Sequence, residues 1–224
     1  MTTPKKPWNR GKIVGRKMPL TPEQVVTIRT LLSQDGNLRD IAMFALAIDS
    51  SLRGIDIVSL NVSDVIQGDE IRERVTIDQR KTHERVTFSM RGYTRVALKE
   101  LIEVENKAYG DPLFSSQKRG RGLRLSVDRY RRLVKGWIAL AHLDPALYGS
   151  HSLRRTRVAH IYRKTANLKV AQVLLGHKSI ENTARYLGIE EGLCCINQLR
   201  DEFSLTLAEL MFSKQPRSWG FQAQ

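Results

Sequence analysis

Apolar residues recur at helical spacing along most of the chain, which predicts a mainly helical fold. Residues 21–24 (Thr-Pro-Glu-Gln) favour a helix start, because threonine is a good N-cap, proline suits the first helical position and the glutamine can complete a capping box. Residues 35–37 (Asp-Gly-Asn) are expected to end this helix and to cap the next. The predicted apolar positions of the two helices are Val25, Ile28, Leu31 and Leu32, then Leu38, Ile41, Ala42, Ala45 and Ile48.

One stretch, residues 71–90, alternates with a period of two. Val75 and Ile77 alternate with polar residues, and Val86 and Phe88 do so on the return, so the pattern predicts two strands. The polar residues between them, Gln79–Glu84, predict the turn of a hairpin. The expected fold class is therefore α+β, mainly helical, with a small antiparallel hairpin.

Helical spacing returns after the hairpin. One helix is predicted over residues 94–106 and another over residues 126–140, and Gly176 is expected to end a later helix as a positive-φ cap, with Ser179 capping the next. The predicted apolar positions are Val96, Leu98, Leu101, Ile102 and Val104, then Val127, Tyr130, Leu133, Val134, Trp137 and Ile138, and finally Ile161, Val170, Val173, Leu174 and Leu175.

The chain is strongly basic, which changes the expected partner. It has 37 Lys and Arg against 23 Asp and Glu in 224 residues, a formal net charge of +14. Such a balance favours a polyanion, most simply nucleic acid, although a generic basic protein such as a ribosomal one would share it. No apolar run approaches the roughly 18 to 20 residues of a membrane span, and no signal peptide is recognisable. The only cysteines, Cys194 and Cys195, are adjacent, so a reducing cytoplasm is the expected location.

The cations gather in three places where DNA contacts are plausible. Residues 1–19 are interpreted as a flexible basic arm, the glycine-broken loop of residues 117–124 as a backbone-approaching loop, and the helix of residues 126–140 as a groove helix. A solvated polar surface is the alternative in each case. The candidates for DNA binding are Lys12, Arg16, Lys17, Lys118, Arg119, Arg121, Arg129 and Arg132.

A set of reactive side chains occupies the second half of the chain. His151 stands three residues before Arg154, and Tyr186 follows the Gly-His pair at His177 by nine residues. Upstream, Arg53 follows the second predicted helix and Lys81 lies in the hairpin turn. Each residue alone is more often a surface arginine, a solvated lysine, a satisfied histidine or a core tyrosine. Two histidines this far apart, without a nearby Cys or carboxylate partner, do not form a zinc site.

Taken in order, these six residues resemble the catalytic set of the tyrosine recombinases, the phage-integrase family. The resemblance covers about residues 20–200 and implies that family's catalytic domain, with its hairpin on one edge. It assigns catalysis to Arg53, Lys81, His151, Arg154, His177 and Tyr186.

The resemblance also implies the chemistry. Tyr186 would attack a DNA phosphodiester and form a 3′-phosphotyrosyl bond, Lys81 would protonate the leaving 5′ oxygen, and the arginines would stabilise the transition state. No metal or cofactor is expected. The partner would be double-stranded DNA with specific sites, bound by a homotetramer on two sites, with an accessory DNA-bending protein as a further possible partner and no membrane.

The chain departs from the longer family members, because Arg53 comes too early for a separate N-terminal DNA-binding domain. It resembles the short members, such as the fimbrial phase-switch recombinases, and residues 201–224 are expected to form a C-terminal helix and tail that subunits can exchange. Integration, excision, inversion and plasmid or multimer resolution all stay open, with a mobile element or plasmid favoured by association. The alternative is a catalytically silent DNA-binding accessory protein on the same fold; a topoisomerase-like nickase is disfavoured by the small size.

Overall fold

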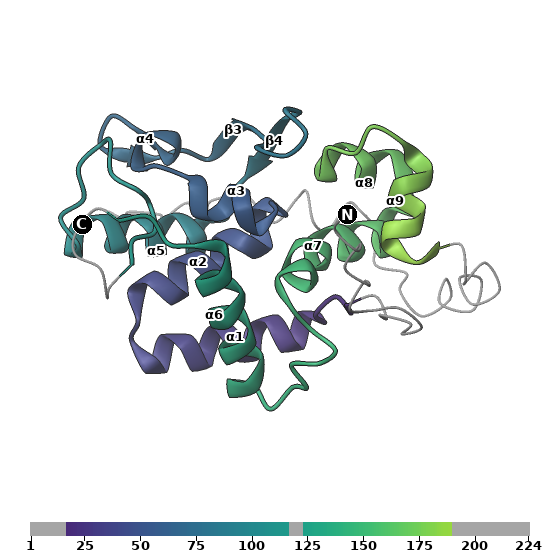
Figure 1. The fold of residues 1–224 in the computed structure, drawn as a ribbon, viewed down its shortest axis with the longest axis horizontal. Coiled ribbons are helices and arrows are strands. Elements are labelled where there is room, and N and C mark those ends of the chain that lie inside the picture. The colour runs from purple at the N-terminus through teal and green to yellow at the C-terminus, as the bar shows by residue number, and fades with distance from the viewer. Residues whose placement is uncertain (1–16, 117–122, 190–224) are drawn as a thin grey trace, which may run out of the picture. The chain divides into compact units, whose positions relative to one another are not determined.

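A computed structural model describes residues 17–116 and 123–189. It confirms the mainly helical α+β class with small antiparallel sheets (Figure 1). The chain divides into two units after Thr183. The first holds every element up to and including α8, and the second begins at Ala184, within α9.

The elements follow one another with short connections. The helices are α1 (Pro22–Asp35), α2 (Leu38–Ser50), α3 (Gly54–Ser59), α4 (Val62–Val65), α5 (Gly92–Val104), α6 (Val127–Leu140), α7 (Ser150–Thr165), α8 (Leu168–Leu175) and α9 (Ile180–Leu187). The strands are β1 (Ile66–Gln67), β2 (Glu70–Ile71), β3 (Arg74–Asp78) and β4 (Arg85–Ser89).

The first two helices form as their sequences predict. The Thr21 hydroxyl accepts from the backbone N–H of Gln24 at 3.2 Å, and the Gln24 side chain accepts from the backbone N–H of Thr21 at 2.9 Å, so the capping box is complete. Gly36 ends α1 with φ 71°, and Asn37 caps α2. Helix α2 is buried almost throughout, from Arg39 to Ser50, and helices α1, α3, α5 and α7 pack against it.

Strands β3 and β4 form the predicted hairpin, which lies beside α3 in Figure 1. Val75 pairs with Phe88, and both side chains are buried. The opposite face is solvated, where the hydroxyls of Thr76 and Thr87 meet at 2.8 Å. One face therefore packs on the helical core and the other faces water, as the period of two requires.

The later helices form where the sequence predicts them, but some of their side chains differ from the predicted burial. Helix α6 buries Tyr130, Val134, Trp137 and Ile138 as expected. Four valines predicted as apolar core positions are exposed instead: Val96 at 66%, Val104 at 68%, Val170 at 38% and Val173 at 65%. Helices α5 and α8 each bury a single narrow face, and these valines lie outside it.

Helix α7 is fixed by polar contacts to the start of the chain and to α2. The Thr156 hydroxyl accepts from the backbone N–H of Leu20 at 3.1 Å, and Arg155 donates to the carbonyl of Lys17 at 2.7 Å. Arg157 donates to the carbonyls of Asp49 and Ser89. Arg155 thus joins α7 to the segment before α1, and these contacts hold α7 in one place and orientation.

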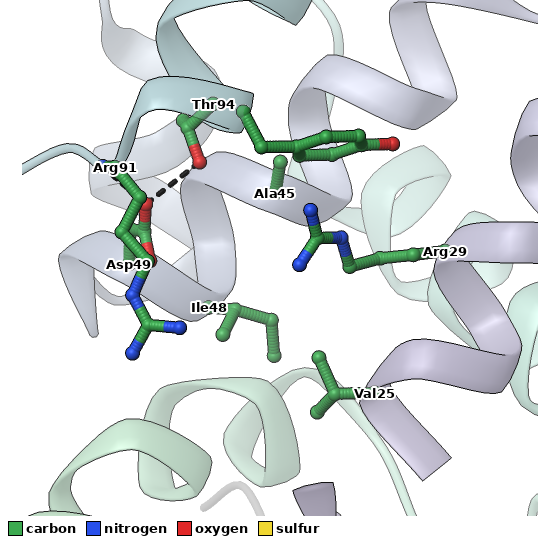
Figure 2. A pocket seen from close by; sticks show the side chains of 8 residues that line it. Val25, Arg29, Ala45, Ile48, Asp49, Arg91 and Thr94 are labelled. Atoms are coloured by element: carbon green, nitrogen blue, oxygen red, sulfur yellow. Dashed lines mark hydrogen bonds and ion pairs between the residues drawn. The ribbon is translucent and has the colours of Figure 1, made fainter. Parts of the chain in front are cut away.

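The carboxylate of Asp49 closes the same junction from the side of α5. It accepts from the hydroxyl of Thr94 at 2.7 Å and from the backbone N–H of Arg91 at 2.8 Å, in the wall of a small pocket between α1, α2 and α5 (Figure 2). Across this pocket, the guanidinium of Arg29 lies over the ring of Tyr93 at 3.6 Å. The start of α5 is therefore joined to α2 by a buried carboxylate.

Candidate functional site

Arg53 stands where the sequence predicts, at the junction of two helices. Helix α2 ends at Ser51 with φ 53°, and Arg53 then takes an extended conformation as the N-cap of α3. Its side chain is partly exposed, and Nη1 donates a hydrogen bond to Oε1 of Gln79. A short, sharply turned connection therefore presents this guanidinium toward the hairpin.

Arg154 lies in the second turn of α7 and is buried, with 2% of its surface exposed. Nη1 donates to the carbonyl of Ser51 at 3.0 Å, and Nη2 donates to the carbonyl of Leu175 at 2.7 Å. These carbonyls belong to the C-terminal ends of α2 and α8, where each helix dipole places partial negative charge. The buried guanidinium is thus stabilised by the ends of two helices.

Gln79 connects the two arginines and was missed in the sequence. Its side chain is fully buried at the end of β3. Oε1 accepts from Arg53, and Nε2 donates at 3.4 Å to the carbonyl of Leu175, which also accepts from Arg154. A continuous chain of hydrogen bonds therefore runs from one guanidinium to the other. The only signal for Gln79 in the sequence is its carboxamide side chain, in the same predicted turn as Lys81.

The hairpin turn carries Lys81, whose side chain is exposed. The turn is held by Asp56 of α3, whose Oδ1 accepts from the backbone N–H of Arg80 at 2.9 Å. Asp56 thus braces the backbone of the turn. On the other side, Lys178 and Glu84 form an ion pair at 3.0 Å, which also links the turn to the segment after α8.

The end of α8 packs tightly on the hairpin, as the Gly176 cap allows. Gly176 has φ 61°, confirming the predicted positive-φ cap. A Cβ here would lie 2.6 Å from Cγ2 of Val86 and 3.2 Å from Nε2 of Gln79. Glycine is therefore needed twice, for its backbone conformation and for the close approach of the hairpin.

His177 follows this cap directly. Its backbone N–H donates to the carbonyl of Gln172 at 3.1 Å, and Nδ1 lies 3.2 Å from the hydroxyl of the fully buried Thr183. Burial, followed by the positive charges of Arg154 and Arg53, lowers the pKa of His177 to about 4. The imidazole is therefore neutral near pH 7.

His151 lies in the first turn of α7, three residues before Arg154, as predicted. Loss of hydration around part of its ring lowers its pKa, and the charges of Arg154 and Arg155 add to the effect, followed by those of Arg131 and Arg53. Both histidines therefore sense the same two arginines. The first unit brings Arg53, Arg154, His151 and His177 into one cluster.

Tyr186 lies in the last turn of α9 and belongs to the second unit. Ser179 accepts from the backbone N–H of Asn182 at 3.1 Å, so the cap predicted for this helix is present. Helix α9 thus begins three residues after His177 and carries the tyrosine.

The cationic candidates have different surroundings. Arg129 and Arg132 lie on α6, where Arg129 is partly exposed and Arg132 is exposed. Lys17 donates to the carbonyl of Ala146, and Met18 to that of Leu147 at 3.1 Å, so the end of the predicted arm contacts the segment before α7. The candidates outside the described residues are Lys12, Arg16, Lys118, Arg119 and Arg121, as is the predicted C-terminal segment, residues 201–224.

The arrangement suits an anion rather than a metal ion. Two permanently charged guanidiniums lower the pKa of both histidines, which means that the electrostatic potential at the rings is positive. Over residues 17–116 and 123–189, no three His, Cys, Asp or Glu side chains gather as metal ligands would. The same residues contain no helix with the length and apolarity to span a bilayer. A phosphate group has the charge and geometry that paired guanidiniums bind.

Known proteins resemble this chain in sequence. Tyrosine recombinase XerC of Treponema denticola is 28% identical over 202 residues, covering 80% of this chain and 63% of that protein. The probable integrase/recombinase YoeC of Bacillus subtilis is 30% identical over 155 residues, covering 69% of this chain and 80% of that protein. The chain spans 50% of the length of a second XerC, that of Thermodesulfovibrio yellowstonii.

Solved structures share the fold. XerA recombinase superposes with a TM-score of 0.66 at 18% identity, covering 84% of this chain and 66% of that one. XerH, in a post-cleavage complex with palindromic difH substrate, superposes with a TM-score of 0.64 at 21% identity, covering 77% and 50%. Residues 19–191 match the sequence profile of the Phage integrase family. The profile spans most of the chain, and this chain therefore belongs to the phage integrase family of tyrosine recombinases.

Proposed function

We propose that this protein is a site-specific DNA recombinase that cleaves and rejoins DNA through Tyr186. The observation that carries the proposal is the cluster of Arg53 and Arg154, joined by hydrogen bonds and electrostatically coupled to His151 and His177. Its positive potential matches the scissile phosphate, and the family supplies the class of reaction.

In the proposed reaction, the hydroxyl oxygen of Tyr186 loses its proton and attacks the phosphorus of a DNA phosphodiester. The bond to the 5′ oxygen breaks as the bond to tyrosine forms, and the exposed ammonium of Lys81 donates a proton to the departing 5′ oxygen. The products are a 3′-phosphotyrosyl bond and a free 5′ hydroxyl. Attack by the 5′ hydroxyl of another strand reverses these steps and exchanges strands without an external energy source.

The cluster would stabilise the added charge of the pentacovalent transition state. Arg53 and Arg154 offer fixed guanidiniums, and each well-placed donor contributes on the order of 10²–10³ in rate. His177 is neutral near pH 7 because of its low pKa, so it can offer a hydrogen bond without competing for the proton of Tyr186. The reference pKa of a tyrosine is about 10, so the attack by Tyr186 requires a cationic surrounding or a base that takes its proton.

The proposed partner is double-stranded DNA carrying specific sites, bound by a homotetramer on two of them, with an accessory DNA-bending protein where the sites require one. The net charge of +14 supports a polyanionic partner. The exposed face of α6, with Arg129 and Arg132, is proposed to contact DNA. XerH, which shares the fold, is known in complexes with its difH substrate.

The test is covalent attachment. Purified protein is incubated with DNA from its own replicon, the reaction is stopped with detergent, and wild type is compared with Tyr186→Phe. An adduct in wild type that is absent in Tyr186→Phe is the expected result, with DNA binding retained in both. Sequencing the adduct ends gives the cleavage site.

A nicked substrate, whose released 5′ fragment cannot return, traps any adduct that religation would hide. If wild type binds DNA but gives no adduct even on this substrate, the recombinase proposal is wrong. The accessory-protein function, with the same fold and no cleavage, then takes its place.

A further inference from the structure

We propose that Gln79 is a positioning residue for DNA cleavage, which sets the orientation of Arg53 and couples it to the end of α8. This inference rests on the proposed recombinase function, since it concerns the same cluster. Gln79 does not need to touch DNA in this role. It acts through Arg53.

The contacts of Gln79 divide between the two ends of its carboxamide. Oε1 accepts from Nη1 of Arg53 and from the hydroxyl of Thr82, the latter at 2.8 Å. Nε2 donates at 3.4 Å to the carbonyl of Leu175, where Arg154 also donates at 2.7 Å. A carboxamide is planar and rigid, with an acceptor oxygen and a donor nitrogen at separate positions. A carboxylate only accepts, and a hydroxyl has a single oxygen for both roles.

The backbone fixes where this amide lies. The N–H of Gln79 donates to the carbonyl of Glu84 at 2.9 Å, and its carbonyl accepts from the N–H of His83 at 2.8 Å. The side chain is fully buried, and a Cβ added at Gly176 would lie 3.2 Å from its Nε2. Gln79 is therefore held at both ends, and its own position is determined before any ligand arrives.

Arg53 differs from Arg154 in the support that it receives. Arg154 is buried between two helix ends, whereas Arg53 is partly exposed at the start of the short helix α3. A long, exposed arginine loses rotamer entropy when it is immobilised on a ligand. A fixed acceptor such as Oε1 of Gln79 orients the guanidinium in advance, and this preorganisation is the property that transition-state stabilisation requires.

The obvious variant is Gln79→Met, which keeps the length of the side chain and removes both hydrogen bonds to the arginine network. We expect the rate of adduct formation at saturating DNA to fall on the order of 10²-fold, the size of effect that displacement of a catalytic group produces. DNA affinity should change much less. The matched control is Thr82→Val, which removes a different hydrogen bond to the same Oε1 and should retain the wild-type rate within about threefold, a difference of less than 1 kcal/mol.

A double-mutant cycle separates positioning from a merely structural role. If Gln79 acts through Arg53, Gln79→Met slows cleavage in the wild-type background but has little further effect once Arg53→Ala is present. Additive losses in the cycle, or a wild-type rate in Gln79→Met, would overturn the inference. Circular dichroism and urea unfolding establish that the variants fold. If Gln79→Met does not, the cycle is run with Gln79→Leu, which also removes the acceptor for Arg53.

A second readout does not depend on cleavage. Release of Arg53 in Gln79→Met weakens its effect on His177, so an NMR titration of the free protein should show the pKa of His177 rising from its low value, while Thr82→Val leaves it unchanged. An unchanged His177 titration in folded Gln79→Met contradicts the inference. If wild type forms no adduct at all, the proposed function fails, and this titration still decides whether Gln79 orients Arg53.

Discussion

Replacing Arg154 with methionine tests whether this arginine stabilises the free protein, in addition to the catalytic role proposed for it. Arg154 is 2% exposed and donates to the carbonyls of Ser51 and Leu175 at 3.0 and 2.7 Å. Arg154→Met preserves most of the volume of the side chain and removes both donors. The C-terminal ends of α2 and α8 then lose the cation that stabilises them.

The expected loss follows from these contacts. A buried carbonyl left without a donor costs about 1–3 kcal/mol, so two such groups give roughly 2–6 kcal/mol. Two effects reduce this range. The carbonyl of Leu175 keeps the longer hydrogen bond from Gln79, and removing the arginine also removes the cost of burying its charge. We expect Arg154→Met to lower the free energy of unfolding by about 2–4 kcal/mol.

Urea denaturation of free wild-type and variant protein, followed by circular dichroism, measures this difference. The matched control is Arg131→Met on α6, which removes an exposed guanidinium paired with Asp128 at 2.8 Å and should change the free energy of unfolding by less than about 1 kcal/mol. If Arg154→Met unfolds at the same urea concentration and with the same slope as wild type, the helix ends do not depend on this guanidinium and the reasoning fails.

Two further predictions concern the end of α8. The pKa of His177, lowered to about 4 by burial and then by the arginines, means that the folded protein binds fewer protons than the unfolded chain between pH 6.5 and about 4. Stability should therefore decrease over this window as the pH falls, more in wild type than in His177→Gln, and an NMR inflection near pH 6.5 would contradict the assignment. Gly176→Ala places a Cβ 2.6 Å from Val86 at φ 61°. It should destabilise the protein by about 1–3 kcal/mol in thermal or urea unfolding, and a wild-type midpoint would show that the hairpin yields freely.

Local signals in the sequence were sufficient for most of the fold. The capping box at Thr21, the glycine at the end of α8 and the period of two in the hairpin are properties of neighbouring residues, and each formed as predicted. The order of the six reactive residues was also readable, because it depends only on the chain. The exposed valines Val96 and Val173 show the limit, since the width of a buried face depends on which helix packs against it.

Gln79 shows why part of the site was not predictable. In the sequence it is the first residue of a polar turn, and nothing local distinguishes it from Arg80 or Thr82. Its partners are Arg53, 26 residues away, and the carbonyl of Leu175, 96 residues away. Backbone carbonyls carry no sequence signature, so a site built partly from helix ends becomes visible only when the chain is folded.

The carbonyl of Leu175 links the stability of the end of α8 to the arrangement of the two arginines. It accepts from Arg154 and from Gln79, and Gln79 in turn holds Arg53. The residue that follows the glycine cap of the same helix is His177. A change at any of these groups therefore alters both the end of α8 and the potential presented to a phosphate.

A variant of Arg154 that loses cleavage does not by itself identify a catalytic arginine, because the same loss follows from movement of α8. The comparison that separates the two causes is between Arg154→Met and Gly176→Ala: both disturb the end of α8, but only the first removes a positive charge. If Gly176→Ala, once folded, cleaves DNA far faster than Arg154→Met at equal loss of stability, the difference between them measures the contribution of the guanidinium to the reaction.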